Sequence, residues 1–335
     1  MLEGMLIAAF AVGATRGFVY CRKQASNAAS SITTAIEQAR KHNFVGYGIL
    51  GADFDFEVSV FTYSAGFIGG EETAALAAIS GQRAMPSQQP PFPSQSGLRK
   101  KPTLVHSAET FATIPWIIAN GGEEFTRIGT QQSTGTKFFV LDGDVRNKAL
   151  VELPFGATIR QAIFDMGQGT ATGKAIKAVQ IGGPLGGCIP ENLLDTPLDY
   201  EELRELGTIL GSGRLTVINE KTCMVGYAQQ VMAYLSNEAC GKCAPCRLGT
   251  KRMATILEGI ISSIGKPEDI DLISELGQNV RDASLCEFGA GAPNIVTTTL
   301  QYFGDDYRQH LEQGKCPTAQ CQPTRRYRYQ RRAVL

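Results

Sequence analysis

The first eighty residues alternate between stretches of helical periodicity and short apolar runs. One stretch has apolar side chains at i, i+3, i+4 and i+7, namely Ile32, Ala35, Ile36 and Ala39. The predicted elements, in order, are a helix at 3–13, a strand at 17–22, a helix at 25–41, a strand at 57–62 and a helix at 71–79. This alternation is typical of an α/β layer. The layer begins with a helix and no preceding strand, as if the first half of a sheet were absent.

A second pattern begins near residue 136. Apolar runs at 137–142 and 150–153 predict a hairpin, which is followed by a predicted helix at 158–166 and a strand at 175–181. Hairpin, helix and strand in this order predict a small β-grasp domain.

The last third of the chain is helical. Its clearest stripe has apolar residues at i, i+3, i+4, i+7, i+8 and i+11, namely Met253, Ile256, Leu257, Ile260, Ile261 and Ile264. Three more stripes include Val225, Ile270 and Val296, so the sequence predicts a four-helix bundle. The predicted fold class is therefore α/β + α, with an incomplete α/β domain at 1–130, a β-grasp domain at 131–200, a helical bundle at 201–312 and a basic tail at 313–335.

Composition narrows the class of protein. The 335 residues are 43% hydrophobic and 19% charged with a formal net charge of +0, so no overall field attracts nucleic acid or a membrane surface. We expect neither a nucleic-acid partner nor a membrane span. Nine cysteines, an odd number, argue against a secreted disulfide framework and favour a reducing compartment, the cytoplasm. Arginine and tyrosine alternate at 325–332, as in some RNA-binding segments, but a solvated tail or a partner-docking strand is favoured.

The strongest chemical signal is the spacing C-x2-C-x2-C formed by Cys240, Cys243 and Cys246. Three thiolates from one tight loop, completed by a fourth from Cys286, are the ligand set of a [4Fe–4S] cluster. Gly241 supplies the backbone freedom that the loop needs. A structural zinc site and cysteines that only pack are the alternatives. Zinc more often uses two separated C-x2-C pairs, and packed cysteines do not gather three in seven residues.

A second candidate site lies at the end of the last predicted helix. His310, Cys316 and Cys321 have the spacing H-x5-C-x4-C, and Cys223 precedes the first bundle helix. Three thiolates and one imidazole form a tetrahedral set suited to zinc. The alternative is two loose thiols in a frayed tail.

Several further segments, taken with the cysteine spacing, resemble one known family. They are Gly69-Gly-Glu-Glu-Thr-Ala74, Pro90-Pro-Phe-Pro93, Ile181-Gly-Gly-Pro-Leu-Gly-Gly-Cys-Ile-Pro190, Leu210-Gly-Ser-Gly213, Thr222-Cys-Met-Val225 and Ala292-Pro-Asn294. Over about residues 3–321 the chain resembles the NADH-oxidising flavoprotein subunit of respiratory complex I. It is still more similar to the equivalent subunit of NAD(P)-linked and electron-bifurcating [FeFe] hydrogenases and of NAD-dependent formate dehydrogenases.

This resemblance implies a partial FMN- and NADH-binding α/β domain, an SLBB-like β-grasp domain and a bundle that carries one [4Fe–4S] cluster. It implies hydride transfer from NAD(H) to FMN, followed by single-electron transfer through the cluster. The implied partners are a small [2Fe–2S] thioredoxin-like subunit and a larger iron–sulfur, hydrogenase or formate dehydrogenase subunit. The alternative is a noncatalytic cluster-carrying relay that has lost flavin and NADH binding.

The resemblance also assigns candidate cofactor residues, although the sequence departs from the family at some of these positions. The positions are Phe67, Gly70, Glu71, Glu72, Phe92, His106 and Ser107. His106 and Ser107 occupy the place of a usual Asn-Asn pair, Phe67 replaces a usual tyrosine, and no Gly-rich phosphate loop is present. We therefore expect either a gene fragment or a paralogue without flavin. For Glu71 and Glu72 the alternative is acids that complement a helix start, and for Phe92 it is a buried loop anchor.

Overall fold

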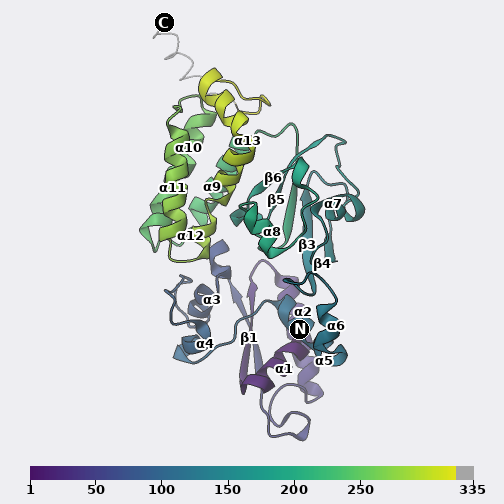
Figure 1. Ribbon diagram of the computed structural model, residues 1–335. Coiled ribbons are helices and arrows are strands. Elements are labelled where there is room, and N and C mark those ends of the chain that lie inside the picture. The colour runs from purple at the N-terminus through teal and green to yellow at the C-terminus, as the bar shows by residue number, and fades with distance from the viewer. Residues whose placement is uncertain (322–335) are drawn as a thin grey trace. The chain divides into compact units, whose positions relative to one another are not determined.

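The computed structural model describes residues 1–321 and divides the chain into two compact units, the first at Met1–Phe125 and the second from Thr126 onward (Figure 1). The first unit contains α1 (Leu2–Val12), β1 (Arg16–Arg22), α2 (Ser26–Lys41), β2 (Glu57–Tyr63), α3 (Glu72–Ile79), α4 (Pro93–Ser96), α5 (Ala108–Asn120) and α6 (Gly122–Thr126), whose last residue belongs to the second unit. The α/β alternation predicted from the sequence is therefore correct.

Strands β1 and β2 form a two-stranded parallel sheet, with register from Arg16 opposite Glu57 to Arg22 opposite Tyr63. A parallel pair needs a crossover connection, and α2 supplies it. A small apolar core that includes Met5, Ile36 and Phe56 holds these elements together.

The second unit contains a five-stranded mixed sheet. Its elements are β3 (Thr136–Gly143), β4 (Leu150–Pro154), α7 (Ile159–Gln161), a π-helical turn (Ala162–Met166), β5 (Ile176–Ile181), β6 (Cys188–Pro190), α8 (Tyr200–Glu205) and β7 (Arg214–Asn219). The strand order is β4-β3-β7-β5-β6, and only the β3–β7 pair is parallel. The central strand β7 therefore lies beyond residue 200, within the range predicted to be helical bundle.

The helical part follows the sheet directly. It consists of α9 (Met224–Glu238), α10 (Ala244–Ile261), α11 (Asp269–Ala283), the short α12 (Glu287–Gly291) and α13 (Asn294–Gln313). The predicted stripe on α10 is confirmed, because Met253, Leu257 and Ile260 are completely buried. Ile264 is exposed instead, because the helix ends at Ile261, before the predicted stop at Gly265.

Sheet and bundle share an apolar core. Ala178, Cys188 and Ile218 of the sheet belong to the same buried cluster as Met232 and Tyr307 of the helices. Strand β6 packs against α13, and α13 packs in turn against α9 (Figure 1). This packing brings residues near the end of the chain next to residues that precede the first bundle helix.

Candidate metal centres and cofactor site

The loop between α9 and α10 carries the three closely spaced cysteines. Cys243 is the residue at the N-terminal boundary of α10, and Cys246 lies in the first turn, where it is 5% exposed. The backbone N–H of Lys242 donates to the Sγ of Cys240, and Arg247 donates from Nη1 to the carbonyl of Gly241 at 2.7 Å. Gly241 has φ +81°, a left-handed conformation that favours glycine. The loop is thus folded back over the start of α10.

Cys286 approaches this loop from the short connection between α11 and α12. It stands at the N-terminal boundary of α12, which packs against α10. Burial raises the pKa of the Cys246 thiol to about 12, and the nearby sulfurs of Cys243, Cys286 and Cys240 add to the rise. The sulfurs of Cys243, Cys286 and Cys240 therefore lie close enough to Cys246 for their negative charges to disfavour its thiolate. Such a group is stabilised when a metal cluster neutralises it.

The helix starts at this site have a favourable electrostatic effect. A helix N-terminus carries a partial positive charge, which stabilises anions in the first turn. The long helix α10 begins directly at the cysteine loop. The cysteine donor set and the positive helix end thus fit an anionic iron–sulfur cluster.

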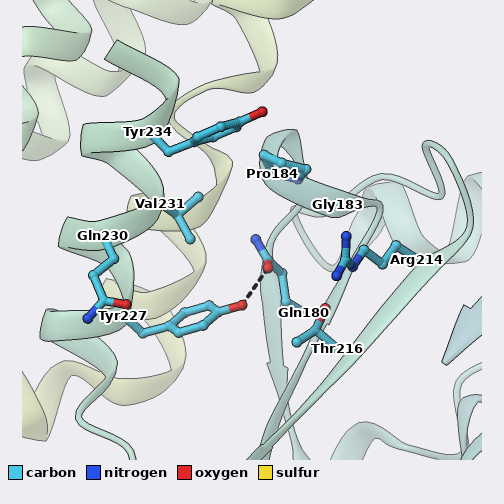
Figure 2. Close-up of a pocket in the computed structure, with 9 residues that line it drawn as sticks. All are labelled: Gln180, Gly183, Pro184, Arg214, Thr216, Tyr227, Gln230, Val231 and Tyr234. Carbon is cyan, nitrogen blue, oxygen red and sulfur yellow. Dashed lines mark hydrogen bonds between the residues drawn. The ribbon is translucent and has the colours of Figure 1, made fainter. Parts of the chain in front are cut away.

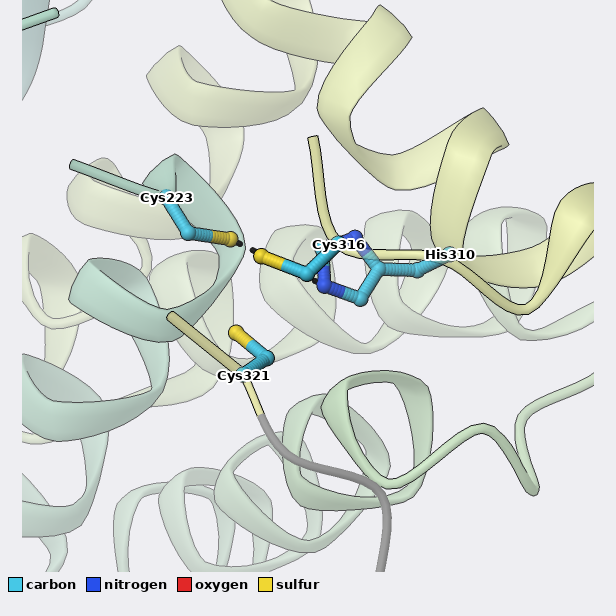
Figure 3. Close-up of side chains that lie close together, drawn as sticks. All are labelled: Cys223, His310, Cys316 and Cys321. Atoms are coloured by element: carbon cyan, nitrogen blue, oxygen red, sulfur yellow. Dashed lines mark hydrogen bonds between the residues drawn. The ribbon is translucent and has the colours of Figure 1, made fainter. Parts of the chain in front are cut away.

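The second cysteine group also comes together. One ligand atom from each of Cys223, His310, Cys316 and Cys321 lies within 4.8 Å of all the others (Figure 3). Cys223 and His310 are 1% exposed, and the other two are partly buried. The structure thus brings Cys223 and Cys316 close together, as the zinc hypothesis requires. The four residues form a group that can hold a metal ion.

The histidine of this group is oriented for metal binding. The Nδ1 of His310 lies 2.7 Å from the carbonyl oxygen of Asp306, and a carbonyl only accepts, so Nδ1 carries the hydrogen. The other ring nitrogen, Nε2, is 3.8 Å from the Sγ of Cys223. A hydrogen bond from one ring nitrogen to a carbonyl is the usual arrangement for a histidine that ligates through the other.

The pKa values of Cys223, Cys321 and His310 in this group differ strongly from their ordinary values. The hydrogen bond shared with Cys321 lowers the pKa of Cys223, despite burial, to about 4 and raises the pKa of Cys321. Burial alone would lower the pKa of His310, but its hydrogen bond to Cys223 prevails and raises the pKa to about 9. A thiolate beside an imidazolium is the charge state of this group without metal.

The candidate cofactor residues lie in the first unit. The Glu71 carboxylate accepts from the backbone N–H of Ala74 and from the hydroxyl of Thr73, each at 2.7 Å, and so caps α3. The Oε1 of Glu72 accepts from the side chain of Gln89 at 2.7 Å. A capped helix start occupied by carboxylates does not suit a phosphate, whereas carboxylate oxygens suit the hydroxyl groups of a sugar.

The remaining cofactor candidates are on the surface of this unit. Phe92 is 51% exposed at the start of α4, which excludes a buried loop anchor. His106 packs edge-on against the ring of Phe111, with ring centroids 5.7 Å apart. The Oγ of Ser107 caps α5 by accepting from Thr110. Phe67 and Gly70 bound a short 3-10 turn just before Glu71.

A shallow groove of about 250 Å³ separates the sheet from α9 (Figure 2). The hydroxyl of Tyr227 donates to the Oε1 of Gln180 at 2.6 Å across its floor. Arg214 lines the groove and pairs with Asp142. None of the predicted site residues lines this groove. The hydrogen bond between Tyr227 and Gln180 is a polar contact that joins α9 to β5.

Sequence reasoning missed two residues that support the second cysteine group. Lys177 on β5 and Asp306 on α13 form an ion pair of 2.7 Å, with side chains 18% and 11% exposed. Two opposite charges at 177 and 306 give no local signal, and only the packing of β5 beside α13 makes them partners. The tail at 325–332 lies outside the described residues.

Two protein-family models match this chain. Residues 226–310, which include all four cysteines of the first group, match the model of the NADH-ubiquinone oxidoreductase-F iron-sulfur binding region. Residues 1–116 match the model of the Nuo51 FMN-binding domain. The fold and the cysteine site thus define an iron–sulfur flavoprotein class.

Relatives extend this match to nearly the whole chain. NADP-reducing hydrogenase subunit HndC of Solidesulfovibrio fructosivorans is 42% identical over 96% of the chain, which spans 66% of that protein. An NADH-quinone oxidoreductase subunit of Rhizobium meliloti is 35% identical over 95% of the chain and 75% of the relative. The chain belongs to the NADH-ubiquinone oxidoreductase-F family, which includes these two subunits.

A solved structure has the same fold. The crystal structure of NAD+-reducing [NiFe]-hydrogenase in the H2-reduced state superposes with a TM-score of 0.81 at 26% identity. The match covers 92% of this chain and 52% of that chain, so the chain spans about half of it. These relatives belong to hydrogenases and quinone oxidoreductases.

Within residues 1–321, no helix combines the length and apolar character needed to cross a bilayer.

Proposed function

We propose that this chain is the electron-transfer subunit of an NADH dehydrogenase- or hydrogenase-type complex. In this role, it passes electrons between NAD(P)H, by way of FMN, and iron–sulfur clusters. The single observation that carries the proposal is the cysteine group at the start of α10, where the nearby sulfurs of Cys243, Cys286 and Cys240 add to the burial that raises the pKa of Cys246. Cys240, Cys243, Cys246 and Cys286 are the proposed ligands of one [4Fe–4S] cluster.

FMN, when bound, converts the two-electron chemistry of a hydride into single-electron steps. On the protein side, Glu71 and Glu72 fit the hydroxyl groups of a ribityl chain or ribose. Phe92, half exposed, can stack on a planar ring. Phe67, Gly70, His106 and Ser107 are the further candidates by family position. The sequence contains no Gly-rich phosphate loop, so a phosphate cradle is not assigned to any of its residues.

The proposed assembly has two kinds of partner. One is a small [2Fe–2S] thioredoxin-like subunit, and the other is a larger iron–sulfur, hydrogenase or formate dehydrogenase subunit. The five-stranded sheet corresponds in this proposal to an SLBB-like β-grasp domain. A reducing compartment such as the cytoplasm suits nine cysteines, none of which forms a disulfide within residues 1–321.

The experiment that tests this function separates it from a noncatalytic relay. Anaerobically purified protein is analysed for iron, acid-labile sulfide and flavin, and its cluster is then reduced either with NADH or with dithionite. EPR signals after NADH support the role in flavin-dependent electron transfer. A cluster reduced by dithionite only, in protein without flavin, supports the relay. Protein without sulfide contradicts both.

We further propose that Cys223, His310, Cys316 and Cys321 bind one zinc ion. Four ligand atoms within 4.8 Å of one another, three sulfurs and one nitrogen, suit a closed structural zinc site. The ion ties the segment after α13 to the start of α9. Its role in this proposal is to fix the end of the bundle, because metal binding energy at such a site is also folding energy.

A further inference from the structure

The Lys177–Asp306 ion pair lies next to the proposed zinc site and contacts the backbone on both sides of Cys223. The Nζ of Lys177 donates to the carbonyl oxygen of Thr222 at 3.0 Å. The Oδ2 of Asp306 accepts from the backbone N–H of Met224 at 3.0 Å and from Lys177 at 2.7 Å. The residues immediately before and after Cys223 are therefore held by one ion pair.

The same pair also fixes the other buried ligand. His310 lies one helical turn after Asp306 on α13, and its Nδ1–H donates to the Asp306 carbonyl. Asp306 thus contacts the chain at Cys223 through its carboxylate and His310 through its backbone. With only 8% of Asp306 exposed, solvent does not compete strongly for these bonds.

Lys177 brings a third element to this arrangement. It belongs to β5 of the five-stranded sheet, whereas Cys223 precedes α9 and Asp306 lies on α13. The pair is the point at which sheet, first helix and last helix meet beside the ligands. We propose that Lys177 and Asp306 are positioning residues that preset Cys223 and His310 for the metal and couple metal binding to the packing of the sheet on the bundle. This inference rests on the zinc site proposed above.

The coupling has a reciprocal consequence. If the pair holds two ligands in their binding geometry, bound metal must in turn hold the pair and the strand that carries Lys177. Removal of the metal then loosens β5 as well as the segment after α13. Loss of the pair removes this effect on β5 and weakens metal binding, in the range of about 10–100-fold that is typical of groups supporting metal ligands.

The test compares full-length wild-type protein with Asp306→Asn, Lys177→Met and Tyr227→Phe. The control Tyr227→Phe removes another polar contact between β5 and α9, the hydroxyl hydrogen bond to Gln180, and leaves in place the backbone hydrogen bond from Tyr227 to Cys223. Zinc dissociation constants are measured by competition with a chromophoric chelator. Hydrogen exchange of 176–181 is followed with and without zinc.

The expected result is zinc binding weakened about 10–100-fold in Asp306→Asn and Lys177→Met, with wild-type affinity in the control. Zinc should slow exchange of 176–181 in the wild type and in Tyr227→Phe, and much less in the other two. If Asp306→Asn does not fold, Lys177→Met carries the test. Wild-type affinity in both pair variants overturns the positioning role and leaves the zinc site standing. Wild-type protein that binds no zinc overturns the site and the positioning role together.

Discussion

The Sγ of Cys223 and the Nε2 of His310 lie 3.8 Å apart, although 87 positions separate the two residues in the chain. Cys223 precedes the first helix of the bundle and His310 lies in the last helix. The bundle therefore brings the start of its first helix next to the last turns of its last helix. This contact makes the second cysteine group a candidate zinc centre, and the first three predictions rest on it.

Replacement of the histidine should remove zinc without removing iron. We expect His310→Ala to lower zinc content to well below one ion per chain, because three thiolates alone leave the tetrahedron open. Cluster iron should not change, since Cys240, Cys243, Cys246 and Cys286 form a separate group. Elemental analysis of the purified variant measures both metals. His42→Ala, at an exposed position just after α2, is the control, and equal zinc in the two variants would contradict the site.

Zinc binding should release protons, and its affinity should rise with pH. In the metal-free protein the pKa of His310 is raised to about 9, so the imidazole is protonated at pH 7 and must lose this proton to bind zinc. Cys223 and Cys321 share a hydrogen bond, and zinc displaces the proton that they share. We expect at least two protons released at pH 7, one from His310 and one from the Cys223–Cys321 pair, measured by calorimetry in buffers of different ionisation enthalpy.

The same pKa shift makes a prediction for the metal-free protein. The folded-state pKa of His310 lies above its ordinary value of 6.5, so its stabilising effect is complete below pH 6.5 and is lost as the pH rises through about 9. Denaturation of zinc-free protein between pH 6 and 10 measures this loss. It should be absent in His310→Ala, and an identical pH profile for both proteins would contradict the assignment.

Loss of one cluster cysteine should lower iron and sulfide. Anaerobically purified wild-type protein should contain about four irons and four sulfides per chain if the cluster is [4Fe–4S]. We expect Cys286→Ser to lower both, and also to destabilise the end of the bundle, because the cluster joins α12 to the start of α10. Cys21→Ser, in strand β1 of the other unit, is the control and should keep its iron. Zinc without sulfide in the wild type would contradict the cluster.

Two glycines of α10 should respond oppositely to alanine. A Cβ at Gly249 would stand 2.1 Å from the Cγ2 of Val280, so either the Val280 side chain or the two helices α10 and α11 would have to shift. We expect Gly249→Ala to cost about 1–3 kcal/mol of unfolding free energy, the usual range for overpacking. A Cβ at Gly259 meets only Ile264 at 3.8 Å, an ordinary contact. Gly259→Ala should stabilise by up to about 1 kcal/mol, since alanine favours the helix. Chemical denaturation of both variants measures the difference, and a neutral Gly249→Ala would contradict the close helix contact.

The sequence alone determined the parts of this protein that depend on local pattern. The stripe through Met253, Leu257 and Ile260 specified a buried helix face, because helical periodicity depends only on residues three or four positions apart. The C-x2-C-x2-C spacing likewise identified a metal-binding loop, since three ligands within seven residues need no knowledge of the fold. His310, Cys316 and Cys321 could be named for the same reason.

The tertiary structure decided what depends on residues that are distant in the chain. Strand β7 lies between β3 and β5, and it pairs with both. Both partner strands precede β7 by more than thirty residues. The short apolar run of β7 therefore does not indicate its position in the sheet. Lys177 and Asp306 are 129 positions apart and become partners only because β5 packs beside α13. A charged pair leaves no periodic trace in a sequence. The residues that hold Cys223 and His310 in position were therefore visible only after the chain was folded.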